Sequence, residues 1–217
     1  MTLRWVFPKT VFKGSPQNIN LLKGGIHLKG QLHIHTTASD GNLTPQQAAD
    51  IYADLGFDFI AYTDHDHLLK PDYRKKLATV KTDLLVFVGI ELTVSTRWGY
   101  VHVNQIEGDK EKLYVFNHPA DYGLSVKQIL ECIADVLQQY PVDAIENTHM
   151  GFLTPEFNDA RLIYPKIASD DSHDLLSCGR AWIELDCCRN KDAIIRKIKR
   201  GEFTCGYARG YPQAGLG

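Results

Sequence analysis

The sequence predicts an α/β fold with a largely parallel sheet that closes into a small barrel. Apolar runs typical of buried strands alternate along the chain with segments of helical periodicity. Strand after strand is followed by histidine, aspartate or glutamate, and (β/α) barrels carry their chemistry at the C-terminal ends of their strands. The chain has 217 residues, so the barrel is expected to be small or incomplete beside a typical length of about 250.

Charge and cysteine usage narrow the class of protein. The net charge is −2 and no apolar run has the length of a bilayer span, which argues against a general nucleic-acid or membrane surface. The five cysteines are odd in number and form no C-x-x-C, a pattern that fits reduced thiols. We expect a cytoplasmic protein with no stable nucleic-acid partner and no membrane association.

One domain accounts for most of the chain. Residues 1–25, with Pro8, Gly14 and Pro16 among polar residues, predict an irregular N-terminal lead, and residues 26–217 predict a single barrel domain. Helices are expected near residues 44–55, 72–81, 125–139 and 191–200. Strands are expected near residues 27–35, 57–63, 84–90, 100–106, 113–116, 142–145, 166–168 and 180–185.

The most informative stretch follows the first predicted strand. His33 and His35 are two residues apart, so on a strand both imidazoles point to one side. A turn at Ser39-Asp40-Gly41 then adds a carboxylate. Imidazole and carboxylate are ligands of zinc, manganese and iron. Taken alone, the pair also fits two half-buried polar strand residues.

The later strands repeat the pattern, and the whole set favours a metal site over coincidence. With nitrogen and oxygen ligands from so many strands, more than one ion is required, and we expect two or three divalent ions (zinc, manganese or iron). A carboxylate such as Glu91 can bridge two ions. The candidate metal ligands are His33, His35, Asp40, His65, Glu91, His118, His149, Asp171 and His173. His102, inside a predicted strand, is a candidate either for the metal site or for substrate binding.

These motifs resemble those of the PHP (polymerase and histidinol phosphatase) superfamily. The matching segments are His33-Ile34-His35-Thr36 with Ser39-Asp40-Gly41, Thr63-Asp64-His65, Gly89-Ile90-Glu91, Asn117-His118-Pro119, and Asp171 with His173. The resemblance implies a distorted (β/α)7 barrel of the PHP type and a trinuclear centre. It implies one ion on His33, His35, Glu91 and Asp171, a second on Glu91, His118 and His149, and a third on Asp40, His65 and His173.

Two departures from the family pattern leave assignments open. The segment Glu146-Asn147-Thr148-His149 does not settle whether Glu146 or His149 faces the ions, and Asp170-Asp171 is ambiguous by one residue. Asp171 is preferred because its spacing to His173 matches the family.

Residues close to the predicted ligands are expected either to orient them or to bind the substrate. Metal-bound imidazoles donate their other N–H to a carboxylate or carbonyl, and Asp64, Asp170 and Glu146 are the candidates for that outer role. Arg180 and Arg97 are candidates for binding a substrate phosphate, with surface ion pairs as the alternative.

The resulting hypothesis is a metal-dependent phosphoesterase, with His173 and Asp171 as catalytic residues. A metal-bridging hydroxide would attack phosphorus in a phosphate mono- or diester. The substrate would be a small phosphorylated compound: a nucleotide, a sugar phosphate or a short oligonucleotide. One alternative is hydrolysis of carboxyl or carbamate esters at the same site. The other is a non-catalytic, metal-stabilised scaffold.

Overall fold

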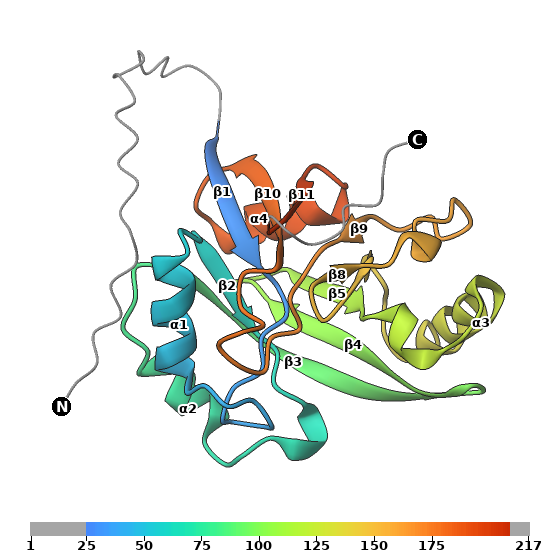
Figure 1. Ribbon diagram of the computed structural model, residues 1–217, viewed down its shortest axis with the longest axis horizontal. Helices are drawn as coiled ribbons and strands as arrows, with labels where there is room; N and C mark the ends of the chain where they lie inside the picture. Colours follow the sequence, from blue (N-terminus) through green and yellow to red (C-terminus); the bar gives the residue numbers. More distant parts are fainter. Residues whose placement is uncertain (1–24, 209–217) are drawn as a thin grey trace.

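One curved sheet organises residues 25–208, the part of the chain that this computed structural model describes (Figure 1). The strand order is β11-β10-β1-β2-β3-β4-β5-β6-β9. Its strands are β1 (Ile26–Gln31), β2 (Phe59–Tyr62), β3 (Leu85–Thr96), β4 (Gly99–Glu107), β5 (Lys112–Phe116), β6 (Ala144–Glu146), β9 (Lys166–Ile167), β10 (Ala181–Cys187) and β11 (Thr204–Tyr207). The short strands β7 (Thr148–His149) and β8 (Phe152–Leu153) form a separate hairpin. Apart from Gly25, the expected N-terminal lead lies outside the described residues.

The sheet is mixed, and the expectation of a largely parallel sheet is wrong in this respect. The pairs β1–β2, β2–β3, β5–β6 and β6–β9 are parallel, whereas β1–β10, β10–β11, β3–β4 and β4–β5 are antiparallel. Only Arg97 and Trp98 separate β3 from β4, and a parallel crossover needs a dozen or more residues. The two edges of the sheet approach each other, since the Cys205 thiol on β11 lies 3.4 Å from the Lys166 carbonyl oxygen on β9. The sheet is therefore a nearly closed barrel.

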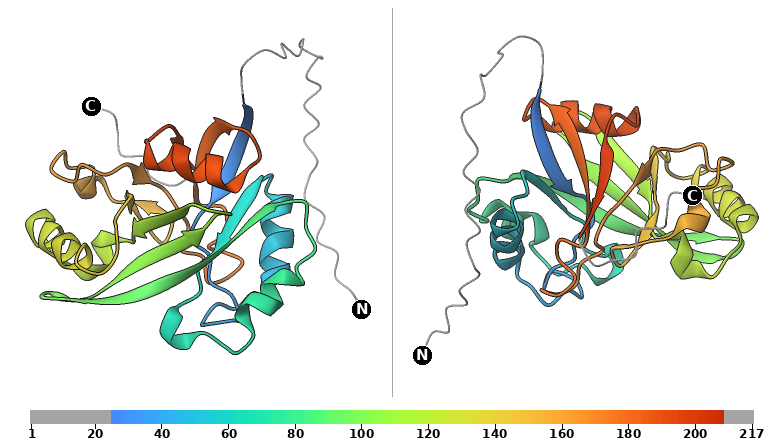
Figure 2. Two further views of the ribbon diagram at one scale, coloured as in Figure 1. Left: turned by 180° about the vertical axis from the view of Figure 1, so that it is seen from behind. Right: turned by 45° about the horizontal axis from the view of Figure 1, so that its top comes forward.

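In the described part of the chain, α-helices lie on the outside of the sheet and at one end of it (Figures 1 and 2). They are α1 (Pro45–Asp54), α2 (Tyr73–Ala78), α3 (Val126–Val136) and α4 (Lys191–Lys199), and three short 3₁₀ helices, η1 (Asp66–Leu68), η2 (Pro119–Tyr122) and η3 (Pro155–Phe157), lie in the connections. Thr44 and Ser125 begin α1 and α3 with capping boxes, each with a glutamine at the third helical position. All four predicted helices are present.

The barrel interior is apolar and is closed at one end by α4. Inward-facing Leu28, Phe59 and Phe87 pack in one cluster with residues from β4, β5, β6, β9 and β10. Ile194, Ile195 and Ile198 of α4 join that cluster, and the Asp192 carboxylate accepts N–H bonds from the β4–β5 turn. The helix therefore covers the end of the barrel where β1 begins. Polar residues are left for the opposite end.

Two further observations concern the helices and the thiols. Among the described residues no helix combines the length and apolarity needed to cross a bilayer. All five cysteines are free thiols, as their spacing predicts.

Candidate metal centre

His33 and His35 continue the direction of β1 beyond its last sheet residue. Ile34 lies between the next strand and the segment after β9: its carbonyl accepts from the Thr63 N–H at 2.9 Å, and the His35 N–H donates to the Ser172 carbonyl at 2.9 Å. The Ile34 side chain is buried in the core under α1. Extended alternation therefore directs both histidines to the other side, where their Nε2 atoms lie 3.1 Å apart.

The Glu91 carboxylate lies at the centre of the site. Its Oε1 lies 3.2 Å from His33 Nε2 and 3.1 Å from His118 Nε2, and its Oε2 lies 2.9 Å from His65 Nδ1. His102 Nδ1 on β4 lies 3.4 Å from Oε1, so His102 belongs to the same cluster. Glu91 was expected to follow the end of its strand. It lies within β3 instead, because β3 runs on to Thr96 as one arm of the β3–β4 hairpin.

Asp171, and not Asp170, faces the histidines. Asp171 Oδ1 lies 3.3 Å from the Nε2 atoms of both His33 and His35. The Asp170 carboxylate instead accepts from the backbone N–H groups of Gly179 and Ala181 and from the Tyr52 hydroxyl, and burial raises its pKa to about 6. Asp171 has φ +50°, the left-handed region that non-glycine residues adopt mainly at functional sites.

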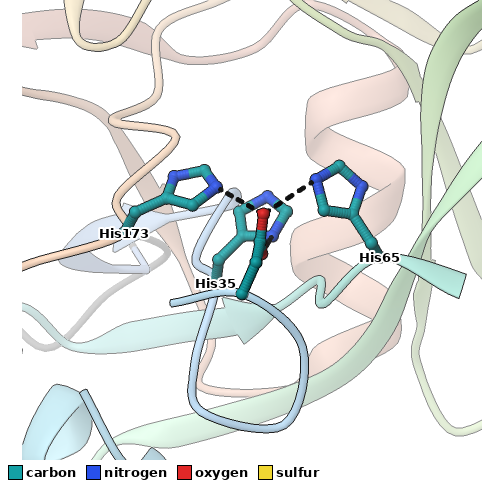
Figure 3. A group of neighbouring side chains, drawn as sticks. His35, His65 and His173 are labelled. Atoms are coloured by element: carbon teal, nitrogen blue, oxygen red, sulfur yellow. Dashed lines mark ion pairs between the residues drawn. The ribbon is translucent and has the colours of Figure 1, made fainter. Parts of the chain in front are cut away.

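A second group of ligands lies on the outer side of His35 (Figure 3). Asp40 Oδ2 lies 3.5 Å from His65 Nε2 and 3.5 Å from His173 Nε2, and Asp40 Oδ1 lies 3.3 Å from His35 Nδ1. These side chains come from three separate segments, following β1, β2 and β9. The turn after His35 therefore carries its carboxylate to a point between three imidazoles.

The carboxylates of Glu146, Asp64 and Asp170, which were expected to orient the ligand imidazoles, have different partners. Of the three, Glu146 contacts an imidazole. Glu146 Oε1 lies 2.8 Å from His33 Nδ1, and its Oε2 accepts the His118 backbone N–H at 2.8 Å. The Asp64 carboxylate accepts from the Thr36 backbone N–H and from the Ser39 hydroxyl. Neither Asp64 nor Asp170, both expected to orient imidazoles, has an imidazole among these partners, because backbone and hydroxyl donors bond to both carboxylates. Asp64 fixes the loop that carries Asp40.

The donor set fits divalent metal ions. Four overlapping groups have ligand atoms that lie within 4.8 Å of one another: His35-Asp40-His65-His173, His33-His118-Asp171, His33-His35-Glu91 and His65-Glu91-His102. Several of these close contacts, including His65 Nδ1 to Glu91 Oε2 and His35 Nδ1 to Asp40 Oδ1, do not have hydrogen-bond geometry, which leaves the buried atoms available as ligands. Ligands about 2.1 Å from a shared ion lie roughly 3.0 to 3.4 Å from each other, close to the spacings found here.

The electrostatics of the site are those of a cluster that needs cations. Burial favours neutral His33 and His35, but the carboxylates around them outweigh it and raise the pKa of both imidazoles well above the usual value. Burial would likewise raise the pKa of Glu91 and Asp171, but the imidazoles lower it. Buried carboxylates and imidazoles that stabilise each other's charged forms are suited to neutralisation by metal ions.

A pocket of about 350 Å³ opens onto these groups. It is lined by His65, Glu91, His102, His118, Asp121, His149, Met150, Asp171 and His173. His149 belongs to none of the four ligand groups; its Nε2 lies 3.3 Å from Asp121 Oδ1. Sequence reasoning missed Asp121 and Met150, although each stands close in sequence to a candidate histidine.

Neither predicted phosphate-binding arginine lines this pocket. Arg97, at the tip of the β3–β4 hairpin, forms an ion pair with Asp135 at 2.6 Å. The Arg180 guanidinium donates to the carbonyl oxygens of Leu176 and Met150, each at 3.1 Å. Arg97 is therefore in the surface ion pair that was its alternative assignment, and Arg180 supports the rim of the pocket from behind.

Solved structures with the same architecture are found at low sequence identity. A two-domain protein from Bacteroides vulgatus, containing a predicted PHP-like metal-dependent phosphoesterase, superposes with TM-score 0.64 at 17% identity over 89% of this chain and 70% of that one. A protein from Bifidobacterium adolescentis named as a metal-dependent phosphoesterase has TM-score 0.53 at 16% identity, over 67% and 87% of the two chains. This chain has the PHP fold.

A third PHP-fold neighbour has a different name. It is an amidohydrolase from Chromobacterium violaceum, with TM-score 0.58 at 15% identity over 81% of this chain and 97% of that one. No family model and no curated protein matches the sequence. The sequence resemblance to the PHP superfamily is therefore confirmed at the level of the fold.

Proposed function

We propose that this PHP-fold protein is a metal-dependent phosphoesterase that hydrolyses a mono- or diester of a small phosphorylated compound. Two or three divalent ions, zinc, manganese or iron, would be held by the ligand groups that meet at Glu91. One observation carries the proposal: the buried Glu91 carboxylate faces imidazoles from separate segments. That arrangement suits a bridging ligand, and two-metal sites are common in phosphatases.

The surrounding residues have definable roles in this reaction. When bound, divalent ions activate a water molecule and neutralise charge on the phosphoryl oxygens. Glu146 holds His33 through Nδ1, which leaves Nε2 for an ion. His173 is 36% exposed and lines the pocket, so it can donate a proton to the departing alkoxide oxygen when its Nε2 does not hold an ion. None of the described residues that line the pocket is a serine or cysteine, which agrees with direct attack by water.

The test combines metal analysis with a phosphate-release screen of the purified protein. Mononucleotides, sugar phosphates and short oligonucleotides would be compared. His33→Ala and Asp171→Ala should lower turnover at least about 100-fold, because each removes a ligand, while circular dichroism shows the same fold. Asp135→Asn, which removes a carboxylate on α3 far from the pocket, is the control and should leave turnover unchanged. Undiminished turnover in both ligand variants would refute the proposal.

A second reaction class deserves a direct comparison because one PHP-fold neighbour is named an amidohydrolase. An activated water can attack a carbonyl carbon as well as phosphorus. A panel of carboxyl and carbamate esters in the same assay separates the two reactions by their kcat/KM values. Full metal occupancy with no turnover of any ester would instead identify a metal-stabilised scaffold.

A further inference from the structure

Among residues 25–208, those that line the pocket offer imidazoles, carboxylates and one thioether, and none of them is a lysine or arginine. Most of its lining residues belong to the ligand groups at Glu91 and Asp40. Asp121, His149 and Met150 do not belong to them. These three side chains are therefore the part of the wall that the remainder of a substrate meets once its phosphoryl group lies at the ligand groups.

Asp121 presents a negative charge at this wall. It lies on η2, three residues after His118, and its backbone N–H donates to the His118 carbonyl at 2.9 Å. Its carboxylate is 51% exposed and lies 3.3 Å from His149 Nε2 and 3.9 Å from His118 Nδ1. The carboxylate is thus held beside the ligands and remains open to the pocket.

Met150 gives the same wall an uncharged surface. It is 47% exposed and has φ +50° at the turn between β7 and β8. The Arg180 guanidinium fixes this turn by donating to the Met150 carbonyl. Arg180 is committed to two carbonyl oxygens, and the Lys70 ammonium is bound to the Thr37 carbonyl. Neither of these two cations is among the residues that line the pocket.

We infer that the site selects monophosphate esters of neutral, hydroxyl-bearing alcohols and rejects substrates with a second phosphate, and that Asp121 determines this choice. The inference rests on the proposed function of the same pocket. A carboxylate accepts hydrogen bonds from hydroxyl groups and repels a second phosphate a few ångströms away. Sugar-type monophosphates fit this wall, whereas bisphosphates and oligonucleotides do not.

The first experiment measures binding, so that it does not depend on turnover. Calorimetry on the metal-loaded protein compares 3-hydroxypropylphosphonate with propane-1,3-diphosphonate, which differ only in whether the far end is a hydroxyl or a second anion. The wild type should bind the hydroxyl compound about tenfold more tightly, as expected for one repulsive charge near the surface. Asp121→Asn keeps the shape and should reduce that preference to about threefold or less. Asp135→Asn should leave it at the wild-type value.

The second experiment measures turnover of fructose 6-phosphate and fructose 1,6-bisphosphate. The ratio of their kcat/KM values should favour the monophosphate about tenfold and should fall in Asp121→Asn, mainly through a lower KM for the bisphosphate. Equal or tighter binding of the diphosphonate by the wild type would overturn the inference. An unchanged preference in Asp121→Asn would also overturn it. Absence of any hydrolysis, with the binding preference intact, would refute the phosphoesterase while sustaining the charge selection.

Discussion

Gly41 shows how one residue determines the position of a ligand. A Cβ at this position would lie 2.5 Å from the His35 carbonyl carbon and oxygen, closer than real contacts allow. The absence of a side chain lets the turn fold back onto the strand, where the Gly41 N–H donates to the Thr36 carbonyl at 2.9 Å. This close approach brings Asp40, the preceding residue, against His35 and His65.

Gly41→Ala should therefore displace Asp40 and weaken the outer ligand group selectively. We expect at least one ion to be lost on dialysis against a mild chelator, while ions at the Glu91 side are retained. Metal content by mass spectrometry measures this. Gly123→Ala is the control, since a Cβ there would meet no atom within 4 Å, although its φ of +62° adds some strain. Equal metal content in wild type and Gly41→Ala would contradict the argument.

The contact between Glu146 and His33 Nδ1 should raise the affinity of the site for metal. Glu146→Gln replaces the acceptor for His33 with an amide and leaves the side-chain volume nearly unchanged. Loss of such an outer partner typically lowers metal affinity about 10- to 100-fold. Competition with a coloured chelator measures the affinity. The matched variant Glu131→Gln, on exposed α3, should bind metal as the wild type does; an unchanged affinity in Glu146→Gln would exclude the orienting role.

Residue chemistry could be predicted where it follows strand ends, and less well where it depends on distant partners. The sequence indicated His33, His35, Glu91 and Asp171 because acids and imidazoles recur after successive strands, and the structure brings these four together. It could not indicate that Asp170 would bind the backbone at Gly179 and Ala181. Those partners lie nine and eleven residues after Asp170, in a turn and a strand start that carry no local pattern linking them to its carboxylate.

Helices and long strands were the predictable elements. Capping boxes and apolar spacing define α1 and α3 in the sequence and in the structure. The strands β7, β8 and β11 were not predicted, because segments of two to four residues carry no measurable periodicity. The length of β3 was underestimated because the residues beyond Glu91 form a hairpin arm that packs against α3, outside the barrel interior.

The packing of α4 against the barrel interior should contribute to the stability of the whole domain. Ile195 is 1% exposed and packs into the barrel interior, so Ile195→Ala should lower the free energy of unfolding by about 2–4 kcal/mol. Urea denaturation measures the change. Arg196→Ala, at an exposed position of the same helix with only a surface ion pair to Glu111, should change it by no more than about 1 kcal/mol. Because α4 closes the end opposite the metal centre, metal content should stay at the wild-type value in the folded variant. A loss below 1 kcal/mol would show that α4 does not close the interior.

In the molecule as a whole, the side chains that stabilise the barrel and the candidate metal ligands lie at opposite ends of it. Apolar side chains and α4 occupy one end, and buried acids and imidazoles occupy the other. The sequence predicted this division from the positions of its polar residues, although it did not predict the mixed strand directions. A buried charged cluster makes the stability of the protein depend on what neutralises it, protons or metal ions.

This dependence sets the response of the metal-free protein to pH. The folded pKa values of His33 and His35 are raised well above 6.5, so the unfolded chain releases these protons first as pH rises. Their contribution to stability is complete below about pH 6.5 and is lost as the pH passes through the folded values. The free energy of unfolding in a chelator should therefore fall as the pH rises above about 6.5.

The metal-loaded protein should behave in the opposite sense over the same range. Metal ions bind deprotonated imidazole and carboxylate, so binding to the folded state strengthens as protons leave. Urea unfolding at several pH values, with chelator and with excess zinc or manganese, compares the two forms. The gap in stability between them should widen with pH. A metal-free protein that gains stability as the pH rises above about 6.5 would contradict the pKa directions at the centre. A constant gap would show that the ions bind outside the histidine cluster, because only ligands that exchange protons for metal give the gap its pH dependence.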